Sequence, residues 1–252
     1  MAVDRLGATD VTCIVLAAGS GKRFGERKQF LELMPGVRLV DAALGVAFEH
    51  TNNVVLVTPQ GARGVIDDRA VVVPGGATRL ESVSNGLSAV SDGQEVVVVH
   101  DAAHPLAPSQ VFAELIEAVR RGADAAVPVL EVSDVIKVTG PDHQLTTVGR
   151  DGMGLAQVPM AFAARSLRAA HHVADDVGLW EDSMLIERAG GEVVAVTGSP
   201  WNIHVTTRED LAMARVLAQH IRGLNDPSTT LEPGSNARTR RTTPPFTSSH
   251  GG

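Results

Sequence analysis

Short apolar segments alternate with amphipathic segments along most of the chain, and this alternation constrains the fold more than any other feature. The apolar segments are rich in Val, Ala, Ile and Leu and span residues 11–18, 53–59, 70–75, 95–102, 124–130 and 192–198. The amphipathic segments have helical periodicity and span residues 39–50, 78–90, 110–122 and 208–222. Strands that are apolar along their whole length are typical of parallel sheets covered on both faces. The pattern therefore predicts an α/β fold, a Rossmann-like, mostly parallel sheet with helices on both faces.

Two of these helices carry start signals in the sequence. Ser109 precedes the helix at 110–122 and is predicted to be its N-cap, because a serine hydroxyl can accept a bond from an N–H of the first turn. Thr206 and Glu209 have the spacing of a capping box at the start of the last helix.

Two segments depart from the alternation and set the expected domain boundaries. Residues 131–162 contain two strand-like stretches around a Gly-Pro-Asp turn that starts at Gly140, which predicts a protruding β-arm. A two-stranded arm is marginally stable alone and is expected to pack on something, often another subunit. From Gly223 the sequence is rich in Pro, Ser, Thr and Gly, so residues 223–252 are predicted to be a disordered tail. Residues 1–222 are predicted to form a single domain.

Charge and composition exclude several classes of protein. The chain has 252 residues and a formal net charge of −7, whereas proteins that bind nucleic acids usually present a basic surface. No segment is apolar enough to cross a bilayer, and residues 1–10 lack the apolar core of a secretory signal. The single cysteine, Cys13, lies in the first apolar segment and is predicted to be a core residue. We therefore expect a cytoplasmic protein with no nucleic-acid or membrane partner.

A loop that combines glycines with cations follows the first apolar segment, in "VLAAGSGKRFGERKQF" at residues 15–30. Phe24 stands where a dinucleotide-binding fingerprint has its third glycine, and no Walker sequence is present. The close pair Gly19 and Gly21 lets backbone N–H groups approach phosphate oxygens. The same loop carries four cations: Lys22, Arg23, Arg27 and Lys28. Cations are needed where negative charge builds on a leaving pyrophosphate, so the loop favours a nucleoside triphosphate over a dinucleotide.

Two further segments are predicted to lie at the same edge of the sheet. The sequence "GGATRLESV" is a turn at Gly75 that leads into a helix carrying Arg79 and Ser82, and helix N-termini bind anions. Asp101 directly follows an apolar strand in "VVVVHDAAHP". A carboxylate in that position suits Mg²⁺, which binds through one or two carboxylates together with substrate phosphates.

The segments "LAAGSGKRF…KQF", "GGATRLESV", "VHDAAHP" and "SDVIKV" together resemble the 2-C-methyl-D-erythritol 4-phosphate cytidylyltransferases of isoprenoid biosynthesis. The resemblance runs from about residue 11 to residue 220, with the motifs in the family's order and spacing. It implies transfer of a cytidylyl group from CTP to a polyol phosphate, release of pyrophosphate, and a need for Mg²⁺. It also implies a homodimer in which the arm crosses to the second subunit.

The resemblance carries site residues over to matching positions. The nucleotide-binding positions are Ala17, Ala18, Gly19, Gly21, Gly75, Arg79 and Ser82. The positions implied to act on the reacting phosphates are Arg23, Lys28 and His204, and Asp101 matches the carboxylate that binds the metal or the substrate. Lys28 is preceded by Arg27, where the family has a proline.

The acceptor side departs from the family. The implied acceptor-binding positions are His104, Val135, Arg150 and Val158. Only Arg150 keeps the family's character, because His104 replaces an arginine, and Val135 and Val158 replace threonines. His204 replaces a lysine in "WNIHVT", and an acidic-hydroxyl patch of the family reads Trp180-Glu181-Asp182 here. Trp180 and Trp201 fit either a wall of an altered acceptor pocket or the core.

Three readings follow from an intact nucleotide side and an altered acceptor side. The first is a methylerythritol phosphate cytidylyltransferase with unusual substitutions. The second is a paralogue that uses CTP on another polyol phosphate, such as ribitol 5-phosphate. The third is a catalytically idle nucleotide-binding or dimer-forming protein, because loss of a cation at the reacting phosphate should reduce the rate more than it disturbs the fold.

Overall fold

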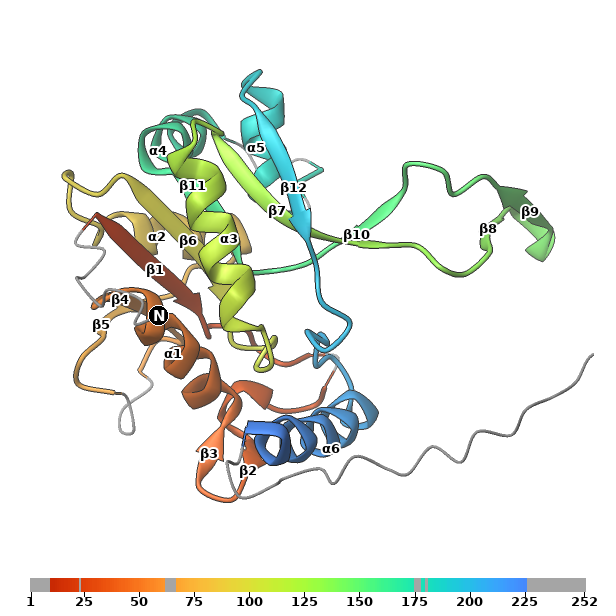
Figure 1. The fold of residues 1–252 in the computed structure, drawn as a ribbon, viewed down its shortest axis with the longest axis horizontal. Helices are drawn as coiled ribbons and strands as arrows, with labels where there is room; N and C mark the ends of the chain where they lie inside the picture. Colours follow the sequence, from red (N-terminus) through yellow and green to blue (C-terminus); the bar gives the residue numbers. More distant parts are fainter. Residues whose placement is uncertain (1–9, 23, 62–66, 175–177, 180, 226–252) are drawn as a thin grey trace, which may run out of the picture.

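The computed structural model describes residues 10–225 except 23, 62–66, 175–177 and 180. Its centre is an eight-stranded sheet formed by these residues (Figure 1). In order across the sheet, the strands are β5 (Val71–Pro74), β4 (Asn53–Thr58), β1 (Val11–Leu16), β6 (Val96–Asp101), β11 (Met160–Ala163) and β7 (Ala125–Glu131). Two further strands, β10 (Gly154–Ala156) and β12 (Val193–Thr197), both pair with β7.

The strands are mostly parallel. The pairs β1–β4, β1–β6, β4–β5 and β7–β12 are parallel, and β10 and β11 run antiparallel to their neighbours. All six apolar segments of the sequence form strands of this sheet, as predicted. The alternation did not predict β11, which pairs between β6 and β7. An antiparallel strand needs no crossover helix, so its insertion leaves no strand–helix alternation in the sequence.

Helices cover both faces of the sheet, which confirms the predicted architecture. On one face lie α1 (Leu39–His50) and α3 (Ser109–Arg120); on the other lie α2 (Arg79–Leu87), α4 (Ala164–Val173) and α5 (Ser183–Arg188). Successive residues of β1 alternate between the two cores, with Cys13 on the α1 side and Ile14 on the α2 side. Cys13 is a buried core residue, as predicted, and burial raises the pKa of its thiol.

A third, smaller core lies beyond the ends of β1 and β6. It joins α6 (Arg208–Asn225) to the hairpin of β2 (Glu32–Met34) and β3 (Val37–Arg38), with Leu33 and Leu211 buried between them. The short 3-10 helix η1 (Lys28–Phe30) leads from the glycine loop into this unit. The helix α6 extends to Asn225, past the expected boundary at residue 222, and the rest of the predicted tail lies outside the described residues.

Neither of the two predicted helix caps, at the starts of α3 and α6, forms as expected. Ser109 is the first residue of α3 rather than its N-cap, and its hydroxyl bonds the His50 ring at 2.9 Å. The capping box of α6 uses Thr207, whose hydroxyl accepts from the Asp210 N–H at 3.2 Å. Asp210 in turn accepts from the N–H of Thr207 at 2.8 Å, so Thr206 and Glu209 do not form the box.

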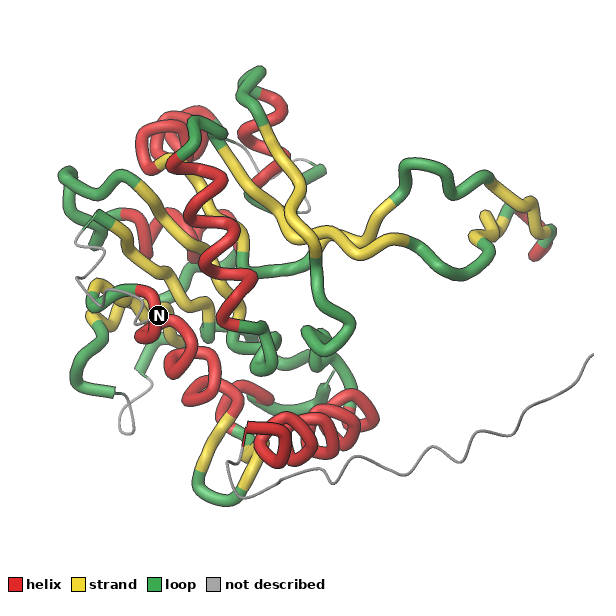
Figure 2. The backbone as a smooth tube through the Cα atoms, in the orientation of Figure 1, coloured by secondary structure: helices red, strands yellow, loops and turns green. Residues whose placement is uncertain are grey.

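The arm protrudes from the main body (Figures 1 and 2). It carries the antiparallel pair β8 (Ile136–Thr139) and β9 (Leu145–Val148), connected through a 3-10 turn, η2 (Pro141–His143). The predicted range of 131–162 is too long, because β10 and most of β11 fall inside it and belong to the central sheet. No helix in the described part of the chain is long and apolar enough to cross a membrane.

We expect Phe162→Ala to lower the free energy of unfolding by about 3–5 kcal/mol, the usual cost of emptying a large aromatic site in a core. Phe162 is fully buried in the α2 side of the sheet, where collapse around the cavity is limited. Urea denaturation followed by circular dichroism measures the loss. Val216→Ala is the control, because Val216 is 65% exposed on α6 and its removal should change little. Equal losses in the two variants would contradict the core assignment.

Candidate active site

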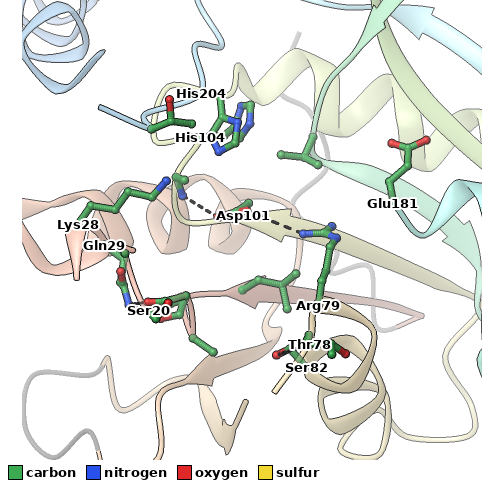
Figure 3. Close-up of a pocket in the computed structure, with 18 of the residues that line it drawn as sticks. Ser20, Lys28, Gln29, Thr78, Arg79, Ser82, Asp101, His104, Glu181 and His204 are labelled. Atoms are coloured by element: carbon green, nitrogen blue, oxygen red, sulfur yellow. Dashed lines mark hydrogen bonds and ion pairs between the residues drawn. The ribbon is translucent and has the colours of Figure 1, made fainter. Parts of the chain in front are cut away.

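A cleft of about 710 Å³ opens at the carboxyl ends of β1 and β6 (Figure 3). Residues from six stretches of chain line it: the glycine loop after β1, the turn before α2, the loop after β6, the segment before β11, the segment before α5, and the segment before α6. Ligands of doubly wound sheets bind at this edge, where loops from neighbouring strands converge. The position of the cleft therefore agrees with the edge predicted from the sequence.

The glycine loop bends sharply at Gly21. Gly21 has a φ of +69°, and a Cβ at this position would lie 1.7 Å from the Glu26 carbonyl oxygen, so no other residue fits the turn. The buried Gln29 amide fixes the loop by donating to the carbonyls of Ala17 at 2.7 Å and Gly19 at 3.0 Å. Ala17, Ala18, Gly19 and Gly21 all line the cleft. Sequence reasoning assigned no role to Gln29, although it lies in the quoted "KQF" segment.

Lys28 reaches into the cleft from η1 (Figure 3). Its ammonium Nζ donates to the backbone carbonyl of Val205 at 2.5 Å, which ties the glycine loop to the segment before α6. A second tie is the ion pair of Glu26 with Arg208 at 2.8 Å. Lys22 also lines the cleft, whereas Arg27 is exposed outside it. Arg23 lies outside the described residues.

The turn before α2 forms the opposite wall. Thr78 is the N-cap of α2 and accepts from the N–H of Glu81, and the Ser82 hydroxyl donates to the Thr78 carbonyl at 2.8 Å. The Ser82 hydroxyl also accepts from the N–H of Gly76 at 3.1 Å. Gly75 does not line the cleft, but a Cβ there would lie 2.3 Å from the Ala18 side chain. Gly75 therefore allows the two turns to approach each other.

Asp101 lies in the middle of the cleft (Figure 3). One of its carboxylate oxygens, Oδ1, accepts from the N–H of Ala103 at 2.9 Å, and the other, Oδ2, lies 3.8 Å from Arg79 Nη1. Burial opposes ionisation of this carboxyl, but Arg79, the Ala103 N–H and the nearby histidines hold its pKa below the usual range. Within the described residues, no three His, Cys, Asp or Glu side chains are placed to hold a metal ion by themselves. A metal at Asp101 would therefore need substrate oxygens as ligands.

Arg79 contacts two carboxylates. Besides Asp101, its Nη2 atom lies 3.1 Å from Asp182 Oδ2, and Asp182 is only 1% exposed. Asp182 also bonds His171, whose side chain is 4% exposed, at 3.1 Å. The "Trp180-Glu181-Asp182" patch is thus divided, because Glu181 lines the cleft, Asp182 lies buried behind it, and Trp180 lies outside the described residues.

Two histidines replace the cations expected on the acceptor side. The rings of His104 and His204 stack with centroids 4.5 Å apart, and both line the cleft (Figure 3). Asn202 supports the pair, because its Oδ1 lies 3.2 Å from His104 Nδ1 and its amide donates to the Val158 carbonyl at 2.6 Å. Burial lowers the pKa of His104, so its imidazole is neutral at pH 7. Val158 lines the cleft beside them.

The structure does not bring two of the acceptor residues into the cleft of their own chain. Val135 is 66% exposed on the arm. Arg150 lines a separate hollow at the base of the arm, together with Glu131 and Asp151. Trp201 also lies outside the cleft, where it is 40% exposed and stacks on His220 at 5.7 Å.

Comparison with known proteins decides the family. The family model described as 2-C-methyl-D-erythritol 4-phosphate cytidylyltransferase matches residues 11–220. This chain belongs to that family. A protein of that name from Rhodococcus jostii is 36% identical over 221 residues, which cover 84% of this chain and 97% of the relative. Another from Rubrobacter xylanophilus is 34% identical over 216 residues, which cover 81% and 93% of the two chains.

A solved structure agrees with the family assignment. The crystal structure of 2-C-methyl-D-erythritol 4-phosphate cytidylyltransferase from Thermus thermophilus matches with a TM-score of 0.74 at 33% identity. The match covers 83% of this chain and 99% of that one. The resemblance and the fold class predicted from the sequence are therefore confirmed. The cytidylyltransferase is a nucleotidyltransferase of isoprenoid precursor biosynthesis, and the comparisons support the first of the three readings.

We expect Gly21→Ala to lower kcat/KM for CTP roughly 10- to 100-fold, because the loop must move to relieve the clash with the Glu26 carbonyl and a shift of about 1 Å misplaces its ligand. Gly25→Ala is the matched control. Gly25 also has a positive φ, +91°, but a Cβ there meets nothing within 4 Å. Steady-state kinetics of pyrophosphate release compares the two. Equal losses would show that backbone strain, rather than the clash at Gly21, controls the loop.

Proposed function

We propose that this cytidylyltransferase transfers CMP from CTP to 2-C-methyl-D-erythritol 4-phosphate in the cleft at the ends of β1 and β6. The observation that carries the proposal is the convergence of the glycine loop, Lys28, Arg79 and Asp101 on one cavity. The loop supplies backbone N–H groups, Lys28 supplies positive charge, and Asp101 supplies an ionised carboxylate. These are the components that a nucleotide triphosphate and a divalent cation require.

We assign the triphosphate to the glycine loop and the nucleoside to the turn before α2. Gly19 and Gly21 place the backbone close to the phosphates, and Arg79 and Ser82 line the wall where base and ribose would lie. Arg23 is assigned to the phosphates by its position in the loop motif.

The reaction proceeds by in-line attack of an acceptor phosphate oxygen on the α-phosphorus of CTP. The new P–O bond forms as the bond to the bridging oxygen of the β-phosphate breaks, and pyrophosphate leaves with the electron pair. The nucleophile is already ionised, so no general base is needed. Lys28 neutralises charge on the triphosphate as it develops, and positioning within the cleft supplies the remaining rate enhancement.

Asp101 fits a Mg²⁺ ligand. It is an ionised oxygen donor within a cleft that offers too few side chains for a protein-only metal cage among the described residues. Mg²⁺ characteristically binds through one or two carboxylates and substrate phosphates. When bound, the ion would neutralise phosphate charge and orient the triphosphate. His204, beside the reacting phosphates, is assigned as a hydrogen-bond donor in place of the family's lysine.

The acceptor site is completed by a second copy of the chain. His104 and Val158 lie in the cleft, whereas Val135 and Arg150 are carried away from it toward the arm. Five exposed large apolar side chains are concentrated between residues 135 and 155: Val135, Val138, Leu145, Met153 and Leu155. An apolar concentration of this kind marks a protein interface, so we assign the arm to the homodimer contact. We also assign residues 1–222 to one domain, since the arm and α6 continue from the same sheet.

We expect pyrophosphate release from CTP and Mg²⁺ with 2-C-methyl-D-erythritol 4-phosphate, and a roughly 100-fold lower kcat in Lys28→Ala, the usual cost of removing one stabilising group from a transition state. Lys28→Arg should restore part of the rate. Arg121→Ala is the control, because Arg121, at the C-terminal end of α3, is an exposed cation that does not line the cleft. Circular dichroism and thermal unfolding verify that each variant is folded.

Other outcomes of this experiment are decisive. Turnover with ribitol 5-phosphate alone would replace the proposed acceptor. Silence with both acceptors, while CTP still binds, would favour an idle protein. Near-native turnover of Lys28→Ala would overturn the assignment of the reaction to this cleft.

We expect the chain to sediment as a dimer and Leu145→Asp to shift it toward the monomer, because a buried charge at an interface has no compensating partner. Leu145 is 63% exposed on the arm. Met213→Asp is the control, since Met213 is 58% exposed on α6, away from the arm. Sedimentation velocity measures both. A wild-type monomer at micromolar concentration, or equal dissociation of the two variants, would contradict the arm-mediated dimer.

A further inference from the structure

Asp182 is a buried carboxylate to which the reaction above assigns no role. It precedes α5, is 1% exposed, and does not line the cleft. Its Oδ2 atom lies 3.1 Å from Arg79 Nη2, and its Oδ1 atom lies 3.1 Å from His171 Nε2. The other ring nitrogen of His171 lies 3.2 Å from the Ser84 hydroxyl on α2. A chain of contacts thus runs from α2 through α4 and back to Arg79.

Arg79 is held between this buried carboxylate and the one in the cleft. Its contact with Asp182 is the closer, at 3.1 Å against 3.8 Å for Asp101. At 3.1 Å the guanidinium donates a hydrogen bond to Asp182, whereas the 3.8 Å contact with Asp101 is too long for one. Arg79 therefore donates its hydrogen bond to Asp182, the carboxylate that does not line the cleft.

We propose that Asp182 is a positioning residue that holds Arg79 back from Asp101 and so leaves the Asp101 carboxylate to a divalent cation. The inference rests on the proposed function, since it takes Asp101 as the cation ligand. Asp182 itself never touches the cation or the substrate. It acts on the cleft only through Arg79.

Arg79 and a divalent cation compete for the same carboxylate of Asp101. A guanidinium that pairs directly with a carboxylate makes short, charge-assisted bonds, and a cation must then displace it. With Asp182 ionised, Arg79 already has a desolvated counter-ion. With Asp182 neutral, the nearest carboxylate to Arg79 within the cleft is Asp101, and the two side chains are close enough to pair after a small movement.

The surroundings of Asp182 keep it ionised and in place. Burial opposes its ionisation, but bonds from His171 and Arg79 hold the pKa of the carboxyl below its usual range. Glu181 is the other carboxylate near Arg79, but burial raises its pKa and Ser183 already donates to it. Glu181 also lines the cleft, where it can turn toward ligand, so it is the poorer counter-ion for Arg79.

The first test compares wild type with Asp182→Asn, which keeps the size of the side chain. Mn²⁺ is the probe, and electron paramagnetic resonance of free Mn²⁺ measures its binding to protein saturated with CTP, without acceptor. We expect a Kd for Mn²⁺ about tenfold higher in the variant, the effect of one added charge-assisted contact that the cation must break. The Mg²⁺ concentration for half-maximal pyrophosphate release should rise by the same factor, with kcat at saturating Mg²⁺ nearly unchanged.

A double variant tests that Asp182 acts through Arg79. Arg79→Gln combined with Asp182→Asn removes the competitor, so Mn²⁺ binding should return toward the wild-type value once CTP is saturating. His171→Leu should weaken Mn²⁺ binding in the same direction, and His171→Gln, which retains a donor, should restore it in part. The histidine variants keep the test decisive where Asp182→Asn does not fold.

The outcomes separate this inference from the proposed function. A wild type that binds no Mn²⁺ in the presence of CTP would overturn the assignment of the cation to Asp101 and this inference with it. Normal Mn²⁺ binding in Asp182→Asn or His171→Leu, with wild-type turnover intact, would overturn the inference alone. A fall in kcat that saturating Mg²⁺ does not relieve would assign Asp182 a purely structural role and also overturn it.

Discussion

The parallel pairing of β1 with β6 places the two halves of the nucleotide site side by side. Its register sets Leu16 opposite Asp101, so the glycine loop starts where the carboxylate ends its strand. The pairing of β1 with β4 and of β4 with β5 brings the turn at Gly75 to the same edge. Both faces of β1, β4 and β6 are buried, so a one-residue slip in register would move each side chain to the opposite face and disrupt its packing against the helices. The geometry of the cleft thus follows from the packing of the sheet core.

Side chains then close the cleft across longer distances in the sequence. Lys28 bonds the carbonyl of Val205, and Gln29 bonds the carbonyls of the loop that it follows. These contacts fix loop segments to one another before a ligand binds. Because the loops of a preorganised cleft are already ordered, less binding energy is lost in ordering them when a ligand binds. More of the binding energy is then available to stabilise the transition state.

The acceptor side has a different electrostatic character from the nucleotide side. The stacked pair of His104 and His204 stands where the family resemblance implies an arginine and a lysine. Since His104 is neutral at pH 7, the pair offers directed hydrogen bonds rather than two fixed charges. Positive charge in this cleft is consequently concentrated at the glycine loop and at Arg79. The charge of Arg79 is shared between Asp101 and Asp182.

The helices and parallel strands could be predicted because their signals are local. Six apolar segments and four amphipathic ones correspond to strands and helices of the structure, with boundaries shifted by a few residues at most. The range of the arm was overestimated because β11 pairs with strands that precede it by tens of residues, and pairing is not encoded in its own composition. The capping box moved by one residue because Thr206 and Thr207 both precede an acidic residue by three positions, and only the backbone selects between them.

By itself, the sequence determined the fold class, the glycine loop, the carboxylate at the end of β6 and the family, since each depends on neighbouring residues or on short motifs. The tertiary structure decided which side chains meet. Arg79 and Asp182 are separated by 103 residues, Ser84 and His171 by 87, and His104 and Asn202 by 98. No local pattern marks these pairs, and Asp182 was predicted only as part of a replaced patch on the acceptor side. Only the packing of α4 and α5 against α2 brings them together, because burial forces each polar group to find its partner inside the fold.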